Sequence, residues 1–314
     1  MKRTLALLLI IVIAASCMTA CKDKKNTDNS GSSGDVLEID VTKESPDSYF
    51  KWRLDPVTYE DSTIIEGLTE EGLKQKTLVF PKKCTEIKRK ALEESSVLET
   101  VAFANDDIQI DNLFSRNISI KTIVLPGKLT TIPETFFSGS GVESVLVPAT
   151  VTTIEKDAFS YCESLKSIDL SKTAITTISL GSFTGCEALE SVKLPDSVKV
   201  IEENAFKYCT LLKDINFPVG LEDIKDEAFR YCKNLKSVTL PESLVSVGSR
   251  TFAECPALAE IYLPETLQVI PIDAFYKMAA MEGFVQLTVY VKEGSFADTN
   301  YQDYFDGSMK KDFY

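Results

Sequence analysis

The sequence predicts a solenoid, a stack of repeated units with a parallel β-sheet along one face. Three consecutive segments of 23 residues carry the same pattern, beginning at Phe183, Phe206 and Phe229. In each segment a Cys follows the Phe by three residues, a Leu follows the Cys by three, and a strand-like run ends at a Pro. A fixed period of this kind indicates one supersecondary unit stacked on copies of itself.

The same period extends in both directions from these segments. An aromatic anchor recurs every 22 to 24 residues, Leu92 takes its place once, and an apolar residue that opens a strand follows six residues later. The anchors are Phe114, Phe136, Phe159, Phe183, Phe206, Phe229, Phe252 and Phe275. About nine repeats therefore cover residues 77–291.

One unit illustrates the expected local structure. In residues 258–264, Ile261 and Leu263 alternate with their neighbours at the period of a strand with one buried face. Pro264 ends the strand because it has no N–H to donate to a sheet. The next apolar residues point back into the core, and a short turn or helix is expected at residues 273–275. A single unit leaves its apolar edge open, and stacking closes it.

The consensus LPxxLxxIxxxAFxxCxxLxxI resembles the BspA-like bacterial type of the leucine-rich repeat superfamily. The resemblance is weaker in the first units, where Leu92 replaces Phe and the Cys position holds Ser95 and Asn117. It implies an α/β solenoid, a right-handed superhelix with a parallel sheet on one face. It also implies an exported or surface-attached protein that binds other macromolecules.

Residues 1–20 are expected to be a signal peptide. Lys2 and Arg3 precede an apolar run at residues 5–15, which is too short to span a bilayer. Cys17 and Cys21 both follow small residues and resemble the acylated cysteine of a bacterial lipoprotein.

We favour lipidation at Cys21, because a polar tether, residues 21–36, begins there. The alternative is an ordinary signal peptide cleaved after Ala20. The lipoprotein interpretation places the chain in the cell envelope, anchored to the outer side of a bacterial membrane.

Two segments outside the repeats are expected to cover the ends of the solenoid. Residues 37–76 form the predicted N-terminal cap, with Trp52 packed over the first unit; an exposed binding Trp is the alternative. Residues 292–314, rich in Tyr and Phe, form the predicted C-terminal cap.

The cysteines of the repeats are expected to be buried free thiols. Five of them occupy one position of the repeat, and an odd number cannot pair completely: Cys162, Cys186, Cys209, Cys232 and Cys255. The chain has no His and no CxxC pair, which argues against zinc. We expect no metal and no cofactor.

Composition excludes other classes of function. The formal net charge is −13, and it becomes −15 when Lys2 and Arg3 leave with the signal peptide. Without a basic stripe, a nucleic acid partner is not expected. The absence of His removes the commonest general base, and no Gly-rich phosphate motif is found. We therefore expect no enzymatic activity and assign no catalytic residue.

Two columns of residues should face outward from the predicted sheet. In the N-terminal half, apolar residues of one column form a strip bordered by hydroxyl residues of the other. With Tyr262 near the C-terminal end, the candidate binding residues are Thr100, Ala102, Thr122, Val124, Ser144, Leu146 and Tyr262. Alternatively, the N-terminal cap or the loop before it covers the strip. A further column alternates Glu and Lys and is expected to stabilise the stacking through ion pairs: Glu99, Lys121, Glu143, Lys166, Glu190 and Lys213.

These observations predict an adhesion-type surface protein, monomeric, whose sheet face binds an extracellular protein or glycan. A structural spacer or envelope-assembly protein without a specific ligand is the alternative. An enzyme acting on glycans is a third, remote class.

Overall fold

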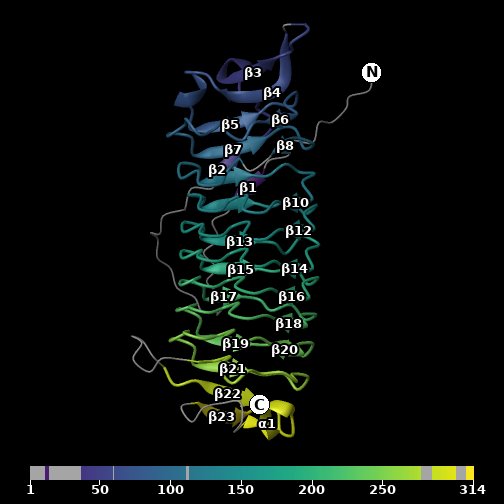
Figure 1. The fold of residues 1–314 in the computed structure, drawn as a ribbon, viewed down its shortest axis with the longest axis vertical. Coiled ribbons are helices and arrows are strands. Elements are labelled where there is room, and N and C mark those ends of the chain that lie inside the picture. The colour runs from purple at the N-terminus through teal and green to yellow at the C-terminus, as the bar shows by residue number, and fades with distance from the viewer. Residues whose placement is uncertain (1–10, 14–36, 59, 111–112, 277–284, 302–308) are drawn as a thin grey trace, which may run out of the picture.

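The chain winds into an elongated solenoid of about ten turns (Figure 1). The computed structural model describes residues 11–13, 37–58, 60–110, 113–276, 285–301 and 309–314. The predicted stacking of repeats is confirmed.

Each turn contributes one strand to a face that we call the front sheet. Neighbouring strands of successive turns pair in parallel, with equivalent residues of the repeat opposite one another. The strands are β5 (Thr77–Phe80), β7 (Thr100–Phe103), β9 (Thr122–Val124), β11 (Ser144–Leu146), β13 (Ser167–Asp169), β15 (Ser191–Lys193), β17 (Asp214–Ile215), β19 (Ser237–Thr239), β21 (Glu260–Tyr262) and β22 (Thr288–Val291). Pairing is interrupted after β11 and after β17, which divides the face into three sheets.

A second column of strands, which the sequence did not predict, runs beside the front sheet (Figure 1). These two-residue strands also stack in parallel, and each begins with a polar or β-branched residue and ends with a buried Ile or Val. They are β6 (Glu86–Ile87), β8 (Gln109–Ile110), β10 (Thr131–Ile132), β12 (Thr153–Ile154), β14 (Thr177–Ile178), β16 (Val200–Ile201), β18 (Asp223–Ile224) and β20 (Ser246–Val247). Two residues are too few for a period to be recognised in the sequence.

Tight turns, and not helices, complete each repeat. Within the described part of residues 77–291 the structure contains no helix. The turns use left-handed backbone at two positions, as at Asp157 (φ 54°) and Tyr161 (φ 57°), on either side of the anchor Phe159. The short helices η1 (Asp47–Tyr49), η2 (Gly72–Lys74) and α1 (Phe296–Thr299) lie outside the repeats.

A column of stacked Phe rings fills the core behind these turns. From Phe159 to Phe275 the ring centroids of successive anchors are 5.0 to 5.9 Å apart and nearly parallel. One anchor was predicted wrongly. Phe137, not Phe136, stacks between Phe114 and Phe159, and Phe136 packs edge-on against it. Both neighbours are fully buried, so hydrophobicity alone did not distinguish them.

The five repeat cysteines lie side by side in the core next to the Phe column. All five are buried and none forms a disulfide, as expected for residues that share one core position of the repeat. Each Sγ donates to a Phe carbonyl of the preceding turn: Cys186 to Phe159 at 3.1 Å, and Cys209 to Phe183 at 3.2 Å. Ser140 occupies the position one turn before Cys162, with Oγ and Sγ 3.5 Å apart. The thiols thus add a hydrogen bond between successive turns.

Ion pairs join successive turns at the edge of the front sheet, as the alternating column predicted. Glu143 contacts Lys121 at 3.7 Å and Lys166 at 2.6 Å, and Lys213 contacts Glu190 at 2.7 Å. These side chains are partly exposed, so each pair contributes about 0.2–1 kcal/mol.

The N-terminal end of the stack is covered by an antiparallel hairpin. Strands β3 (Phe50–Leu54) and β4 (Asp61–Leu68) pair antiparallel, and β4 also pairs in parallel with β6, the first strand of the second column. Phe50 is buried against Phe80, with ring centroids 5.3 Å apart. Trp52 is half-buried against the core, and Lys83 Nζ lies 4.3 Å from the centre of its ring.

Additional strands lie at the C-terminal end and over the front sheet. β23 (Lys310–Phe313) pairs in parallel with β22. Strand β1 (Ile11–Ile13), within the predicted signal peptide, pairs antiparallel with β2 (Leu37–Ile39). Among the residues that the structure describes, no helix has the length and apolar character needed to cross a membrane.

Candidate interaction surfaces

The front sheet brings the predicted strip residues together. Thr122 lies opposite both Thr100 and Ser144 in the paired strands, and Val124 lies opposite Leu146. The register that the sequence predicted is therefore confirmed for these residues.

The apolar strip is covered by the chain's own N-terminal segment. Ala102 is fully buried and Val124 is 5% exposed, because Ile39 and Val41 pack against them. Ser45 fixes the same segment to the edge of β5: its N–H donates to the Val79 carbonyl at 2.9 Å, and its Oγ accepts from the Val79 N–H at 3.0 Å. The alternative interpretation, in which the N-terminal cap covers the strip, is therefore the correct one for the N-terminal half of the front sheet. Ala102 and Val124 are not accessible to a partner while the segment stays in place.

The central part of the front sheet is polar and open to solvent. Its exposed outward residues are Ser167, Asp169, Lys193, Asp214, Asn216, Ser237 and Thr239. Lys193 Nζ lies 3.4 Å from the Asp169 carboxylate. Burial opposes ionisation of Asp169, but hydrogen bonds from Ser171 together with Lys193 keep the pKa of this carboxyl below its usual value. The carboxylate is therefore charged at neutral pH and available to a donor.

An aromatic cluster lies at the C-terminal end of the same face and contains the predicted residue Tyr262. Tyr262 stacks on Tyr290, with ring centroids 4.4 Å apart and planes within 5°. Tyr314 meets Tyr262 edge-on at 5.5 Å, and its hydroxyl donates to the Leu263 carbonyl at 2.8 Å. We call Tyr262, Tyr290 and Tyr314 the aromatic cluster. It joins residues of three different chain segments, so the sequence showed only its first member.

Charged groups border the aromatic cluster. Lys292 Nζ lies 5.7 Å from the Tyr314 ring and 2.5 Å from the Glu242 carboxylate. The hydrogen bond to Glu242 raises the pKa of Lys292, while burial raises the pKa of Tyr262. At neutral pH the phenols of Tyr262 and Tyr314 are therefore neutral and lie next to the Lys292–Glu242 ion pair.

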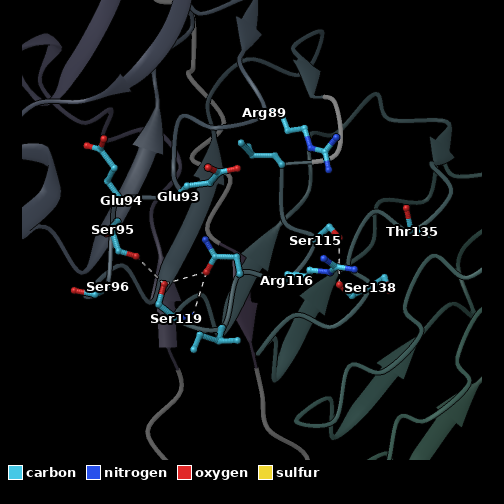
Figure 2. Close-up of a pocket in the computed structure, with 13 residues that line it drawn as sticks. Arg89, Glu93, Glu94, Ser95, Ser96, Ser115, Arg116, Ser119, Thr135 and Ser138 are labelled. Carbon is cyan, nitrogen blue, oxygen red and sulfur yellow. Dashed lines mark hydrogen bonds between the residues drawn. The ribbon is translucent and has the colours of Figure 1, made fainter.

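A polar hollow of about 930 Å³ lies on the turn side of the early repeats (Figure 2). It forms where the Cys position of the repeat holds Ser95 and Asn117. The Asn117 amide oxygen accepts from the Ser119 hydroxyl at 3.0 Å, and Ser119 also donates to the Ser95 carbonyl at 3.2 Å. Its lining includes charged side chains of both signs and hydroxyl groups, among them Arg89, Glu93, Glu94, Ser115 and Arg116. The sequence signal was the loss of Cys at this position, interpreted only as degeneracy of the repeat.

A metal site was not expected from the sequence. No group of three or more Cys, Asp or Glu side chains that could hold a metal ion is present in the part of the chain that the structure describes. Cys17 and Cys21, the candidate lipidation sites, lie outside the described residues.

Solved structures of bacterial repeat proteins align with most of the chain. A leucine-rich repeat protein from Bacteroides ovatus is 19% identical, with 87% of this chain and all of the other covered and a TM-score of 0.45. A leucine-rich cell surface protein from Faecalibacterium prausnitzii is 19% identical, with 86% and 94% covered and a TM-score of 0.44. A leucine-rich repeat protein of T. pallidum is 24% identical, with 79% and 86% covered and a TM-score of 0.37. No functionally curated protein matches.

A family model matches more than half of the chain. The model described as BspA type Leucine rich repeat region (6 copies) covers residues 71–166 and 176–302, and a general leucine-rich repeat model covers residues 149–197. The matched residues include the stacked Phe rings, the five repeat cysteines and both columns of strands. The chain therefore belongs to the BspA-type leucine-rich repeat family.

Proposed function

We propose that this chain is an exported, lipid-anchored surface protein that binds an extracellular protein or glycan through its front sheet. The observation that carries the proposal is the aromatic cluster at the end of an open polar face. Tyr is enriched among residues that dominate binding energy, because it combines a large apolar area with a polar tip. Tyr314 is 49% exposed and Phe313 beside it is 51% exposed, which is unusual for side chains of this size in one place.

Because the N-terminal segment covers the apolar strip, we place the binding surface on the central and C-terminal parts of the front sheet and not on its N-terminal half. Ile39 occupies the apolar strip, whereas polar residues between β13 and β19 remain accessible up to the cluster. A partner on this surface would meet hydrogen-bonding groups in the middle and tyrosines at the end, an arrangement of polar and apolar contacts typical of protein interfaces.

The test is capture of extracellular proteins and glycans by the immobilised chain and by a Tyr262→Ala/Tyr290→Ala variant. We expect the variant to lose a captured partner by at least about tenfold in affinity, or about 1.4 kcal/mol. Ser191→Ala, a half-buried position of the same sheet, is the matched control. Equal capture by all three chains would show that the aromatic cluster does not contribute to binding. No specific capture by the unmodified chain would favour the spacer.

The lipid anchor is tested separately. Cys21→Ala should abolish partitioning of the mature chain into a detergent phase, because stable anchoring depends on the acyl chains. Cys17→Ala is the matched control and should leave partitioning unchanged. The reverse result would transfer the anchor to Cys17.

A further inference from the structure

The polar hollow beside the early repeats lies next to a turn that is one residue shorter than its neighbours. Val142 follows the stacked ring of Phe137 by five residues, whereas Leu165 follows Phe159 by six. The residues of the short turn are all small: Ser138, Gly139, Ser140 and Gly141. The missing residue and the small side chains leave the space of about 930 Å³ open on the turn side of the solenoid.

Two arginines without an acidic partner line this hollow. Arg89 and Arg116 are both exposed, and neither guanidinium forms an ion pair or a hydrogen bond within the described part of the chain. Every other arginine that the structure describes is ion-paired: Arg53 with Glu66 at 2.9 Å, Arg230 with Glu227 at 3.1 Å and Arg250 with Asp273 at 3.3 Å. The unpaired guanidinium groups of the described chain are therefore gathered at one place.

An amide adds further donors to the hollow. The Asn117 Oδ1 accepts from the backbone N–H groups of Ser119 and Ile120, both at 3.1 Å, which fixes the orientation of the amide. Its Nδ2 makes no hydrogen bond to the described residues and can donate to a ligand. The unused hydrogen-bonding capacity on this side of the hollow thus consists of N–H groups, most of them charged, which suit the oxygens of an anion.

The opposite side of the hollow limits the charge of that anion. In the view of Figure 2, Glu93 and Glu94 lie on the other side from Arg89 and Arg116. Glu94 pairs with Lys51 at 3.9 Å, and Glu93 forms no ion pair within the described residues. These carboxylates accept hydrogen bonds from neutral hydroxyls but repel a second negative charge. A ligand that is negative on every side, such as a nucleic acid, is therefore disfavoured.

The size of the hollow also argues against a simple inorganic anion. A space of 930 Å³ is within the range of sites that hold a whole organic ligand. A sulfate or phosphate ion would use the guanidinium groups and leave the acidic side of the hollow without a partner. A ligand with one carboxylate and several hydroxyls satisfies both sides.

We propose that this hollow binds a hexuronic acid residue of an extracellular glycan. Its carboxylate is held by the guanidinium groups of Arg89 and Arg116, whose planar donor pairs match carboxylate oxygens. Its ring hydroxyls meet the Asn117 amide and the Glu93 carboxylate. The site lies on the turn side and does not depend on the front-sheet proposal.

The experiment uses saturation-transfer NMR on the full-length chain in a zwitterionic detergent that contains no sugar. The probes are methyl β-D-glucuronide and methyl β-D-glucoside, which differ only in the carboxylate or hydroxymethyl group at C5; the methyl glycoside represents a sugar linked in a glycan. We expect transfer to the glucuronide and binding of the glucoside that is weaker by about tenfold or more, because it lacks the charged acceptor.

Three outcomes of this comparison overturn the proposal. They are equal transfer to both sugars, transfer to neither, and complete displacement of the glucuronide by sodium sulfate at the same concentration as the sugar. The last would show that the hollow selects negative charge alone and not a sugar acid.

Variants assign the signal to the hollow. Arg89→Gln and Arg116→Gln should each weaken glucuronide binding by about tenfold or more, with an unchanged melting curve because neither guanidinium bonds to the described chain. Arg53→Gln, which removes the same charge outside the hollow, is the matched control and should bind as the unmodified chain does. Glucuronide binding that survives in both hollow variants overturns the site. None of these changes touches the aromatic cluster, so the front-sheet proposal is tested separately.

Discussion

Phe229 occupies the middle of the stacked column, 5.2 Å from Phe206 and 5.3 Å from Phe252 between ring centroids. Its side chain is fully buried, and Phe217 adds an edge-on contact at 5.5 Å. With repeats on both sides, no cap can collapse into the cavity that a smaller side chain would leave.

We therefore expect Phe229→Ala to lower the free energy of unfolding by about 3–5 kcal/mol, as large-to-small changes in packed cores do. The measurement is urea unfolding followed by circular dichroism. Ser237→Ala, exposed on the front sheet, should change the midpoint very little. A comparable shift in both variants would contradict the assignment of the two faces.

The buried cysteines predict a loss of stability at alkaline pH. Burial raises the pKa of Cys209 and Cys232 well above the ordinary range, and that of Cys84 to about 12. In the unfolded chain a thiol ionises near pH 8.5. The folded pKa is the higher one, so the contribution to stability is complete below the unfolded pKa and is lost as pH rises toward the folded value.

Between about pH 8 and pH 10, ionisation of Cys209 in the unfolded chain should therefore cost the folded state about 2 kcal/mol. Cys209→Ala should reduce the pH-dependent loss by that amount relative to the unmodified chain, measured as the difference in unfolding free energy at the two pH values. Other titrating groups are common to both chains and cancel. An identical pH dependence would show that Cys209 is not protected from ionisation.

At the residue scale, the sequence predicted positions better than surroundings. The repeat placed Cys162 and Phe206 in the core because each position recurs with the same chemistry. The prediction of the anchor was wrong at Phe136, because Phe137 is adjacent to it and either residue gives a spacing to the next anchor that fits the repeat.

Among the elements, the N-terminal segment has the most testable role. Ile39 is 4% exposed on the strip formed by Val79, Ala102 and Val124. A charge at Ile39 would have to be buried without a partner, which strongly disfavours the docked position.

We expect Ile39→Asp to release the segment from the front sheet and to accelerate trypsin cleavage after Lys43, while the solenoid stays folded. The readout is the rate of appearance of a chain beginning at Glu44. Val57→Asp, which places the same charge at a position that is 82% exposed, is the matched control. An unchanged cleavage rate in Ile39→Asp would show that this contact does not hold the segment.

The elements that sequence analysis missed share a physical cause. The two-residue strand β14 (Thr177–Ile178) has no intrinsic signal in the sequence and forms because the strand of the next turn, β16 (Val200–Ile201), pairs with it. Likewise, residues 37–45 have no period of their own, and their position is determined by the apolar strip that they cover. Stacking and covering are tertiary effects, which local propensity does not report.

For the whole molecule, the two ends determine whether the stack is closed. A stack of parallel strands leaves unpaired N–H and C=O groups at its last strand, which can pair with another chain. Here β23 pairs along β22, and Lys311 contacts the Asp298 carboxylate at 2.8 Å. The Tyr314 hydroxyl fixes the terminus to Leu263. These contacts make β23 the element that terminates the sheet.

Deletion of residues 309–314 should therefore expose the edge of β22 next to the buried side chains of Val289 and Val291. We expect concentration-dependent self-association of the shortened chain, measured by size-exclusion chromatography with light scattering, whereas the full chain stays monomeric. Tyr314→Ala keeps the backbone of β23 and serves as the control that should also remain monomeric. If the shortened chain were monomeric at every concentration, β23 would be an appendage of the stack. If Tyr314→Ala associated as well, the hydroxyl contact, and not the strand pairing, would be what closes the end.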